Sequence, residues 1–215
     1  GKEIPYLERS RWFEFWLVDP LDGTKEFIKK NGEFTVNVAL IQNSRPVFGI
    51  VYVPVTGVCY FGMKGVGAFR IDRFAKAIEK GASGQDVLLE SLSFCTRLPA
   101  KGLPLENRPL VIVGSRSHQN EALEDFVRRA KTRHTRVEFV AAGSSLKFCR
   151  VAEASADVYP RFGPTMEWDT AAGHAVLSAA GGDVRCMDTG SSLSYNKESL
   201  VNPFFIATLT GIGQF

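Results

Sequence analysis

Two aspartates stand three residues apart at the end of an apolar run, in the stretch FEFWLVDPLDGTKEF at residues 13–27. The run reads as a buried strand, so Asp19 and Asp22 would be held stiffly, and rigid carboxylates suit Mg²⁺, which takes oxygen ligands. Thr24 starts a short helical stretch, which places the amides of Gly23 and Thr24 at a helix N-terminus that favours an anion. A metal site and a phosphate site would then share one turn. An ordinary Asp-Gly turn with a capping aspartate remains the alternative.

A third carboxylate, Asp169, lies in the stretch EWDTAAGHAV, at the expected start of a helix. The small residues 170–173 behind it would let that helix approach another element closely. Asp169 could simply cap its own helix. Three carboxylates on two stiff elements would also suit a two-metal site for phosphoryl transfer.

Ser144 and Lys147 are three residues apart at a second expected helix start, in the stretch GSSLKFC. A shared helix face would give one anion both a hydroxyl and an ammonium group. If Lys147 does not bind an anion, it is a solvated surface lysine. If His118 has no binding role, it is an ordinary loop histidine. We take His134 and His174 as structural.

The elements that must position these residues begin with three strand-like runs at residues 34–41, 46–53 and 58–63. These β-branched and aromatic runs are separated by turn residues, which predicts an antiparallel meander. Strands and helices then mix. A strand is expected from residue 109, a helix at 120–130 with Asn120 as N-cap, a strand at 136–142, a helix from 143 to about 154, and a helix at 166–180 that ends on Gly181 and Gly182.

Length and composition fit a globular chain of 215 residues that is 45% hydrophobic and carries a net charge of only +3. Scattered charge does not indicate nucleic acid as a partner, although a small polyanion fits. No run approaches the roughly 20 apolar residues of a membrane span. Four distant cysteines indicate reduced thiols in a cytosolic protein. The irregular stretch 74–107 predicts a division into units at 1–107 and 108–215, with the active site between them.

Several of these motifs resemble those of a known phosphatase superfamily. The stretches WLVDPLDGTKEF and EWDTAAGHAVLSAAGG resemble the lithium-sensitive, magnesium-dependent phosphatases that include inositol monophosphatase and fructose-1,6-bisphosphatase. Within that superfamily, NGEFTVNVALI, GSRSH, GSSLKFCRVAEASADVYPR and PTMEWDTAAGHAV resemble the CysQ-type 3'(2'),5'-bisphosphate nucleotidases. The resemblance implies an α+β fold, a layered α/β sandwich of the inositol monophosphatase type.

The resemblance also implies roles for the acidic turn. The Asp19 carboxylate would bridge metals, the Leu21 carbonyl would bind one of them, and Asp22 and Asp169 would bind a second. Thr24 would orient the attacking water molecule.

Further residues match positions that hold the substrate in the family. The Gly23 and Thr24 amides would hold the scissile phosphate. Ser144, Lys147 and Arg161 would contact the rest of the substrate, with His118 near the base or sugar.

The implied reaction is direct hydrolysis of the 3'-phosphate of adenosine 3',5'-bisphosphate, which yields AMP and phosphate as part of sulfate assimilation. The sulfated form of this nucleotide is a further implied substrate. Two or three Mg²⁺ ions per site and inhibition by Li⁺ are implied. The expected setting is cytoplasmic, with peripheral association at the inner membrane face allowed, as a monomer or homodimer.

One feature departs from the family pattern. A Glu-Glu pair expected upstream of the acidic turn is absent, and we do not assign Glu3 or Glu8 as ligands. We therefore expect the family's first helices to be missing here and activity to be low without them. Inositol monophosphatase and a binding remnant without turnover are the alternatives. A haloacid-dehalogenase phosphatase is disfavoured, because its two aspartates are two residues apart rather than three.

Overall fold

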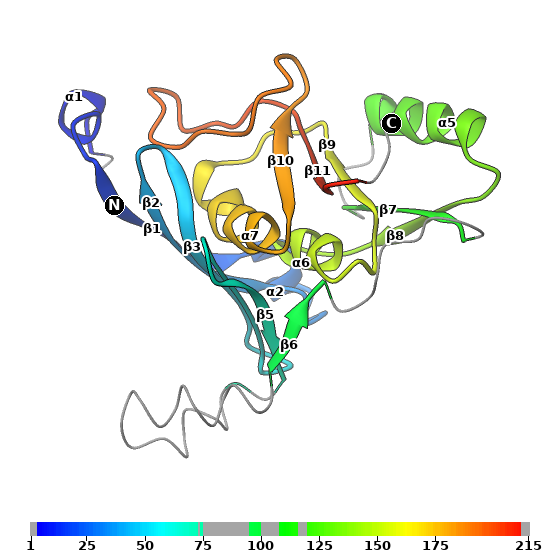
Figure 1. Ribbon diagram of the computed structural model, residues 1–215, viewed down its shortest axis with the longest axis horizontal. Coiled ribbons are helices and arrows are strands. Elements are labelled where there is room, and N and C mark those ends of the chain that lie inside the picture. Colours follow the sequence, from blue (N-terminus) through cyan, green and yellow to red (C-terminus); the bar gives the residue numbers. More distant parts are fainter. Residues whose placement is uncertain (1–3, 73, 75–94, 100–107, 116–119, 212–215) are drawn as a thin grey trace.

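The computed structural model describes residues 4–72, 74, 95–99, 108–115 and 120–211. Its elements form two β-sheets with helices between and beside them (Figure 1). This architecture confirms the expected α+β sandwich. Among the described residues, no helix combines the length and apolar character that crossing a bilayer requires.

The first sheet has six strands in the order of the chain, and every neighbouring pair is antiparallel. Its strands are β1 (Glu14–Asp22), β2 (Thr35–Gln42), β3 (Arg45–Val53), β4 (Val58–Met63), β5 (Gly67–Ile71) and β6 (Cys95–Leu98), with short helices α1 (Tyr6–Arg9) and α2 (Thr24–Ile28) beside β1. The predicted meander is confirmed. Strand β6 lies in the stretch that we took as the least regular of the chain, and the sequence analysis did not predict it.

The second sheet is mixed, in the order β10-β11-β9-β7-β8, with β7 parallel to both β8 and β9. Its elements are β7 (Leu110–Gly114), α5 (Glu121–Arg133), β8 (Val137–Ala141), α6 (Leu146–Ala152), β9 (Val158–Arg161), α7 (Glu167–Ala179), β10 (Gly182–Cys186) and β11 (Phe205–Leu209). Asn120 caps α5 as predicted, by accepting a 3.0 Å hydrogen bond from the Leu123 amide. Residues 100–107 lie outside the described ranges, so the division at residue 107 stays a prediction.

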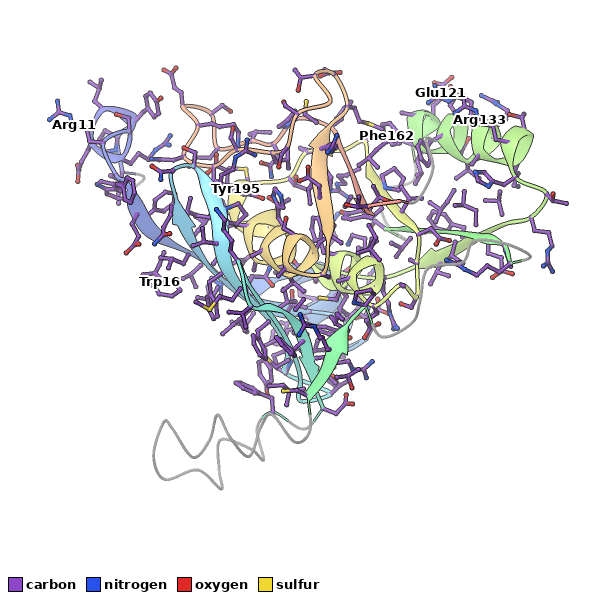
Figure 2. All side chains as sticks on the ribbon, in the orientation of Figure 1. Arg11, Trp16, Glu121, Arg133, Phe162 and Tyr195 are labelled. Atoms are coloured by element: carbon purple, nitrogen blue, oxygen red, sulfur yellow. The ribbon has the colours of Figure 1, made fainter. Side chains whose placement is uncertain are left out.

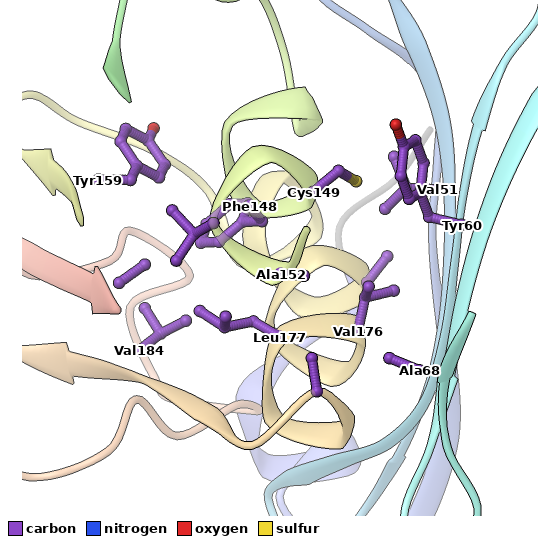
Figure 3. Packing of buried hydrophobic residues seen from close by; sticks show 14 of the residues in the cluster. Val51, Tyr60, Ala68, Phe148, Cys149, Ala152, Tyr159, Val176, Leu177 and Val184 are labelled. Atoms are coloured by element: carbon purple, nitrogen blue, oxygen red, sulfur yellow. The ribbon is translucent and has the colours of Figure 1, made fainter. Parts of the chain in front are cut away.

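Helices α6 and α7 fill the space between the sheets, as Figures 1 and 3 show. Val51 and Tyr60 from the first sheet, Phe148 and Val176 from these helices, and Val184 from the second sheet belong to one buried cluster (Figure 3). Burial of apolar surface contributes roughly 25 cal/mol per Å², so this shared core is what fixes α7 relative to both sheets.

The outer face of the first sheet is open in the described structure. Strand β1 is an edge strand, and Trp16 is 59% exposed although the sequence predicted a buried strand. Figure 2 shows Trp16 on the outer side and Tyr195 on the side of α7. The buried-strand prediction was therefore wrong for one face, because only Phe15 and Leu17 of the central β1 residues turn toward the core.

Candidate active site

The acidic turn is built by an irregularity in the pairing of β1 with β2. Asp19 lies opposite Asn37 and Asp22 lies opposite Thr35, so β1 advances by three residues where β2 advances by two, and β1 therefore contains one extra residue. Residues three apart on a regular strand face opposite sides, but this extra residue turns both carboxylates to the face of Asn37 and Thr35. That face is the buried one, since both partners are at most 1% exposed.

Asp19 and Asp22 are therefore both part of β1, whereas the sequence analysis predicted that they come after the strand. Asp169 joins them from the first turn of α7, and the three residues offer carboxylate oxygens within 4.8 Å of one another. The sequence prediction that these three acidic residues meet is confirmed.

Each carboxylate is anchored through one oxygen. Asp19 Oδ1 accepts from the Leu21 amide at 3.0 Å, and Asp169 Oδ2 accepts from the Met166 amide at 2.8 Å. Asp22 Oδ2 accepts from three side chains, Thr35, Asn37 and Ser145. The Asp19 and Asp169 carboxyl groups also lie within hydrogen-bonding reach of each other. Fixed carboxylate oxygens this close together fit a hard divalent cation.

The electrostatics agree with that fit. Burial raises the pKa of Asp169 to about 6, against the Met166 hydrogen bond, and the charges of Asp22 and Asp19 raise it further. Burial also raises the pKa of Asp19. Carboxylates that repel one another in a half-buried site are stabilised in their ionised form by a cation. The capping alternative for Asp169 is confirmed, since its Oδ2 atom accepts from the amide of the N-cap residue Met166, while metal binding by Asp169 stays a prediction.

Gly23 begins the short helix α2 in the left-handed conformation, with φ +89°. A Cβ here would stand 2.0 Å from Ser144 Oγ, which itself donates a 2.8 Å hydrogen bond to the Asp22 carbonyl. Glycine is therefore required by both backbone and space. The contact joins the acidic turn to the loop before α6.

A pocket of about 280 Å³ opens over this junction. It is lined by seven of the predicted site residues, Asp22, Gly23, Thr24, Ser144, Lys147, Arg161 and Asp169. Lys25, Glu26, Ser115, Tyr159 and Thr165 also line it, and the sequence analysis did not select them. His118 lies outside the described residues. The Leu21 carbonyl remains a prediction, because the observed contact uses the Leu21 amide.

Lys147 is only 5% exposed, so the solvated alternative was wrong. Its ammonium donates to the carbonyls of Ser144 at 2.6 Å and Ala142 at 3.4 Å, and lies 5.4 Å from the Tyr159 ring centroid. Burial lowers the pKa of Lys147 to about 8, against the raising effect of Asp22. An ammonium has three donors, so one stays available to a ligand.

The predicted shared helix face was wrong, because α6 begins only at Leu146 and Ser144 has a left-handed φ of 46°. Ser144 and Lys147 instead meet through the serine carbonyl. Arg161, at the end of β9, donates to the carbonyls of Gly163 at 3.2 Å and Pro164 at 3.0 Å. Neither Lys147 nor Arg161 forms an ion pair with a described carboxylate.

His174 lies buried in α7, where its ring contacts Tyr195 at 2.9 Å and Asp183 at 3.2 Å, so it serves the packing of α7. Asn37 and Ser145, which hold Asp22, were missed. A signal existed for Asn37, because it occupies a buried-parity position of β2, and buried polar groups are normally hydrogen-bonded.

Comparison with known proteins places the chain. The model of the inositol monophosphatase family matches residues 8–210. The 3'(2'),5'-bisphosphate nucleotidase CysQ of Salmonella typhimurium is 44% identical over 202 residues, 94% of this chain and 70% of that protein. The Escherichia coli CysQ is 44% identical over 198 residues, 92% of this chain and 69% of that protein.

Solved structures agree. CysQ from Bacteroides thetaiotaomicron superposes with a TM-score of 0.85 at 45% identity, covering 97% of this chain and 74% of that one. Staphylococcal IMPase-II, with a TM-score of 0.66 and 22% identity over 93% of this chain and 68% of that one, shares the fold alone. The chain belongs to the inositol monophosphatase family.

Proposed function

We propose that the protein is a 3'(2'),5'-bisphosphate nucleotidase that hydrolyses the 3'-phosphate of adenosine 3',5'-bisphosphate to AMP and phosphate. The observation that carries the proposal is one pocket that contains both carboxylates and cations. Asp22 and Asp169 line it together with Lys147 and Arg161, and neither cation forms an ion pair with a described carboxylate. A substrate with two phosphates fits such a pocket better than a monophosphate does.

The cluster of three aspartates would hold Mg²⁺ through Asp19, Asp22 and Asp169, with the Leu21 carbonyl as a further ligand. When bound, the cations neutralise charge on the phosphate and make a water molecule more acidic. The oxygen-only donor set supports Mg²⁺ over softer metals. Inhibition by Li⁺ belongs to the same proposal.

The chain's own groups orient the reaction. The Gly23 and Thr24 amides would donate to the scissile phosphate, and the Thr24 hydroxyl would accept a hydrogen bond from the attacking water. That water forms a bond to phosphorus as the bond from phosphorus to the ribose 3'-oxygen breaks, and this oxygen leaves with a proton as the hydroxyl of AMP. Ser144, Lys147 and Arg161 would hold the remaining phosphate and ribose, with His118 near the base or sugar.

The test is a comparison of kcat/KM for adenosine 3',5'-bisphosphate and inositol 1-phosphate on the purified protein with Mg²⁺. We expect a clear preference for the bisphosphate. Equal values would remove the assignment and favour the inositol monophosphatase alternative. Tight binding of the bisphosphate without phosphate release would favour the binding remnant.

The cellular setting is part of the proposal. The four free cysteines fit a reducing compartment and so support a cytoplasmic setting, while the role in sulfate assimilation is proposed from the similarity to the CysQ nucleotidases.

A further inference from the structure

The Asp22 carboxylate and the helix that carries Asp169 are joined by one buried hydroxyl group. Ser145 Oγ lies 2.8 Å from Asp22 Oδ2 and 2.8 Å from the Asp169 carbonyl oxygen, and the residue is 1% exposed. Asp22 comes from β1 of the first sheet and Asp169 from α7, so these two ligands have no common backbone element. Among the described side chains, Ser145 is the one that lies within hydrogen-bonding distance of both.

Asn37 completes the arrangement from β2. Its Nδ2 group donates to Ser145 Oγ at 2.9 Å and to Asp22 Oδ2 at 3.1 Å. The amide has two N–H bonds and uses both here, while the single Ser145 proton serves either Asp22 or the Asp169 carbonyl. Both choices keep the serine oxygen between the two ligands.

The amide oxygen of Asn37 indicates that the residue is present for its N–H donors. Asn37 is 1% exposed, yet its Oδ1 atom has no hydrogen-bond partner among the described residues. A buried amide normally satisfies its oxygen as well, because an unpaired acceptor costs stability. The residue is therefore held for its donors, and both of these donors are directed at the Asp22–Ser145 pair.

The consequence falls on Asp22. Thr35 and Asn37 donate to Oδ2 and the Ser145 hydroxyl lies 2.8 Å from the same atom, so the contacts of the described residues all fall on Oδ2 and fix the rotation of the carboxylate. We propose that Ser145 and Asn37 are positioning residues that set the orientation and separation of Asp22 and Asp169 for the divalent cation. This inference rests on the proposed function, since it assumes a cation at these carboxylates.

The test measures cation binding without substrate, by calorimetric titration of the purified protein with Mn²⁺. Partners that orient metal ligands typically contribute 10–100-fold in affinity. We expect Ser145→Ala and Asn37→Leu each to weaken Mn²⁺ binding by about 10-fold or more. Ser145→Thr keeps the hydroxyl and should restore affinity to within about 3-fold of wild type.

A matched control separates positioning from general stability. Thr208 lies in β11, away from Asp22 and Asp169, and its hydroxyl donates to the backbone carbonyl of Asp157 at 3.1 Å. Thr208→Val removes a hydroxyl from the other sheet, and we expect unchanged Mn²⁺ affinity even if its unfolding temperature falls. The unfolding temperature of each variant is measured first, and Asn37→Leu provides a second arm if Ser145→Ala does not fold.

In turnover, the same variants should need about 10-fold more Mg²⁺ for half-maximal rate, with KM for the bisphosphate unchanged at saturating Mg²⁺. Wild-type Mn²⁺ affinity in folded Ser145→Ala and Asn37→Leu would overturn the positioning role while leaving the proposed function intact. A wild-type protein that binds no Mn²⁺ would overturn both.

Discussion

The ammonium group of Lys147 lies 2.6 Å from the carbonyl oxygen of Ser144, the residue whose hydroxyl holds the backbone of Asp22. Lys147 is thus connected through one residue to the acidic turn. Because Lys147 is buried and bonded on two sides, its position is set before any substrate arrives. Preorganisation of this kind reduces the entropy lost on binding.

The first prediction concerns Lys147→Ala. Loss of a charge-assisted contact of roughly 1.5–3 kcal/mol should raise KM for adenosine 3',5'-bisphosphate by about 10–100-fold. A small phosphate ester that does not reach Lys147 should be hydrolysed almost normally. Lys131→Ala, on the exposed side of α5, is the control and should leave both substrates unchanged. Equal losses on both substrates would place Lys147 at the reacting phosphate.

The second prediction concerns pH. Burial lowers the pKa of Lys147 to about 8, so its ammonium is charged below that pH and loses charge above it. Phosphate monoesters are already dianionic there, since their second pKa is about 6. We therefore expect kcat/KM for the bisphosphate to fall as pH rises through about 8. The profile of Lys147→Met should lack this step, and an identical step in that variant would assign it to another group.

The third prediction concerns the metal-free protein. Because burial raises the pKa of Asp169 to about 6, the folded state keeps a proton that the unfolded chain loses near pH 4. Stability should therefore fall as pH rises from about 4 to 6 and stay reduced above it. Asp169→Asn keeps an oxygen for the Met166 amide and should be more stable than wild type above pH 6, by about 1–3 kcal/mol.

Urea unfolding in the presence of a chelator measures this difference, and addition of Mg²⁺ provides the control. The cation should stabilise wild type more than Asp169→Asn, because the variant lacks one charged ligand. If the variant is less stable than wild type at every pH without metal, the carboxylate serves mainly as a helix cap.

The sequence predicted the parts of this site that depend on local pattern. A β-branched run separated from the next by turn residues predicted strand β2, and Asp22 and Asp169 were selected by residue type and spacing. The pairing irregularity between Asp19 and Asp22 could not be predicted, because it depends on which residues of β2 lie opposite.

The burial of Lys147 and the role of Ser145 were missed for a related reason. Both depend on contacts between α6, α7 and the first sheet, which lie far apart in the chain. A lysine near a helix start is most often solvated, and only the packing of α6 between the sheets encloses this one. Strand β6 was missed because four residues carry too little pattern to be distinguished from a loop.

The fourth prediction concerns the packing that presents Asp169. A Cβ at Gly49 of β3 would stand 2.5 Å from the Ala172 carbonyl oxygen and 2.7 Å from Ala175 Cβ, both in α7. Backbone cannot yield as a flexible side chain can, so Gly49→Ala should push α7 away from the sheet and cost about 1–3 kcal/mol. The displaced helix would carry Asp169 with it, so Mg²⁺ affinity should fall together with stability.

Gly163→Ala is the stability control. Its Cβ would meet no described atom closer than 3.7 Å, so the substitution should change the unfolding free energy little. Calorimetry with and without Mg²⁺ measures both quantities, and a Gly49→Ala protein as stable as wild type would show that α7 can shift along the sheet without loss.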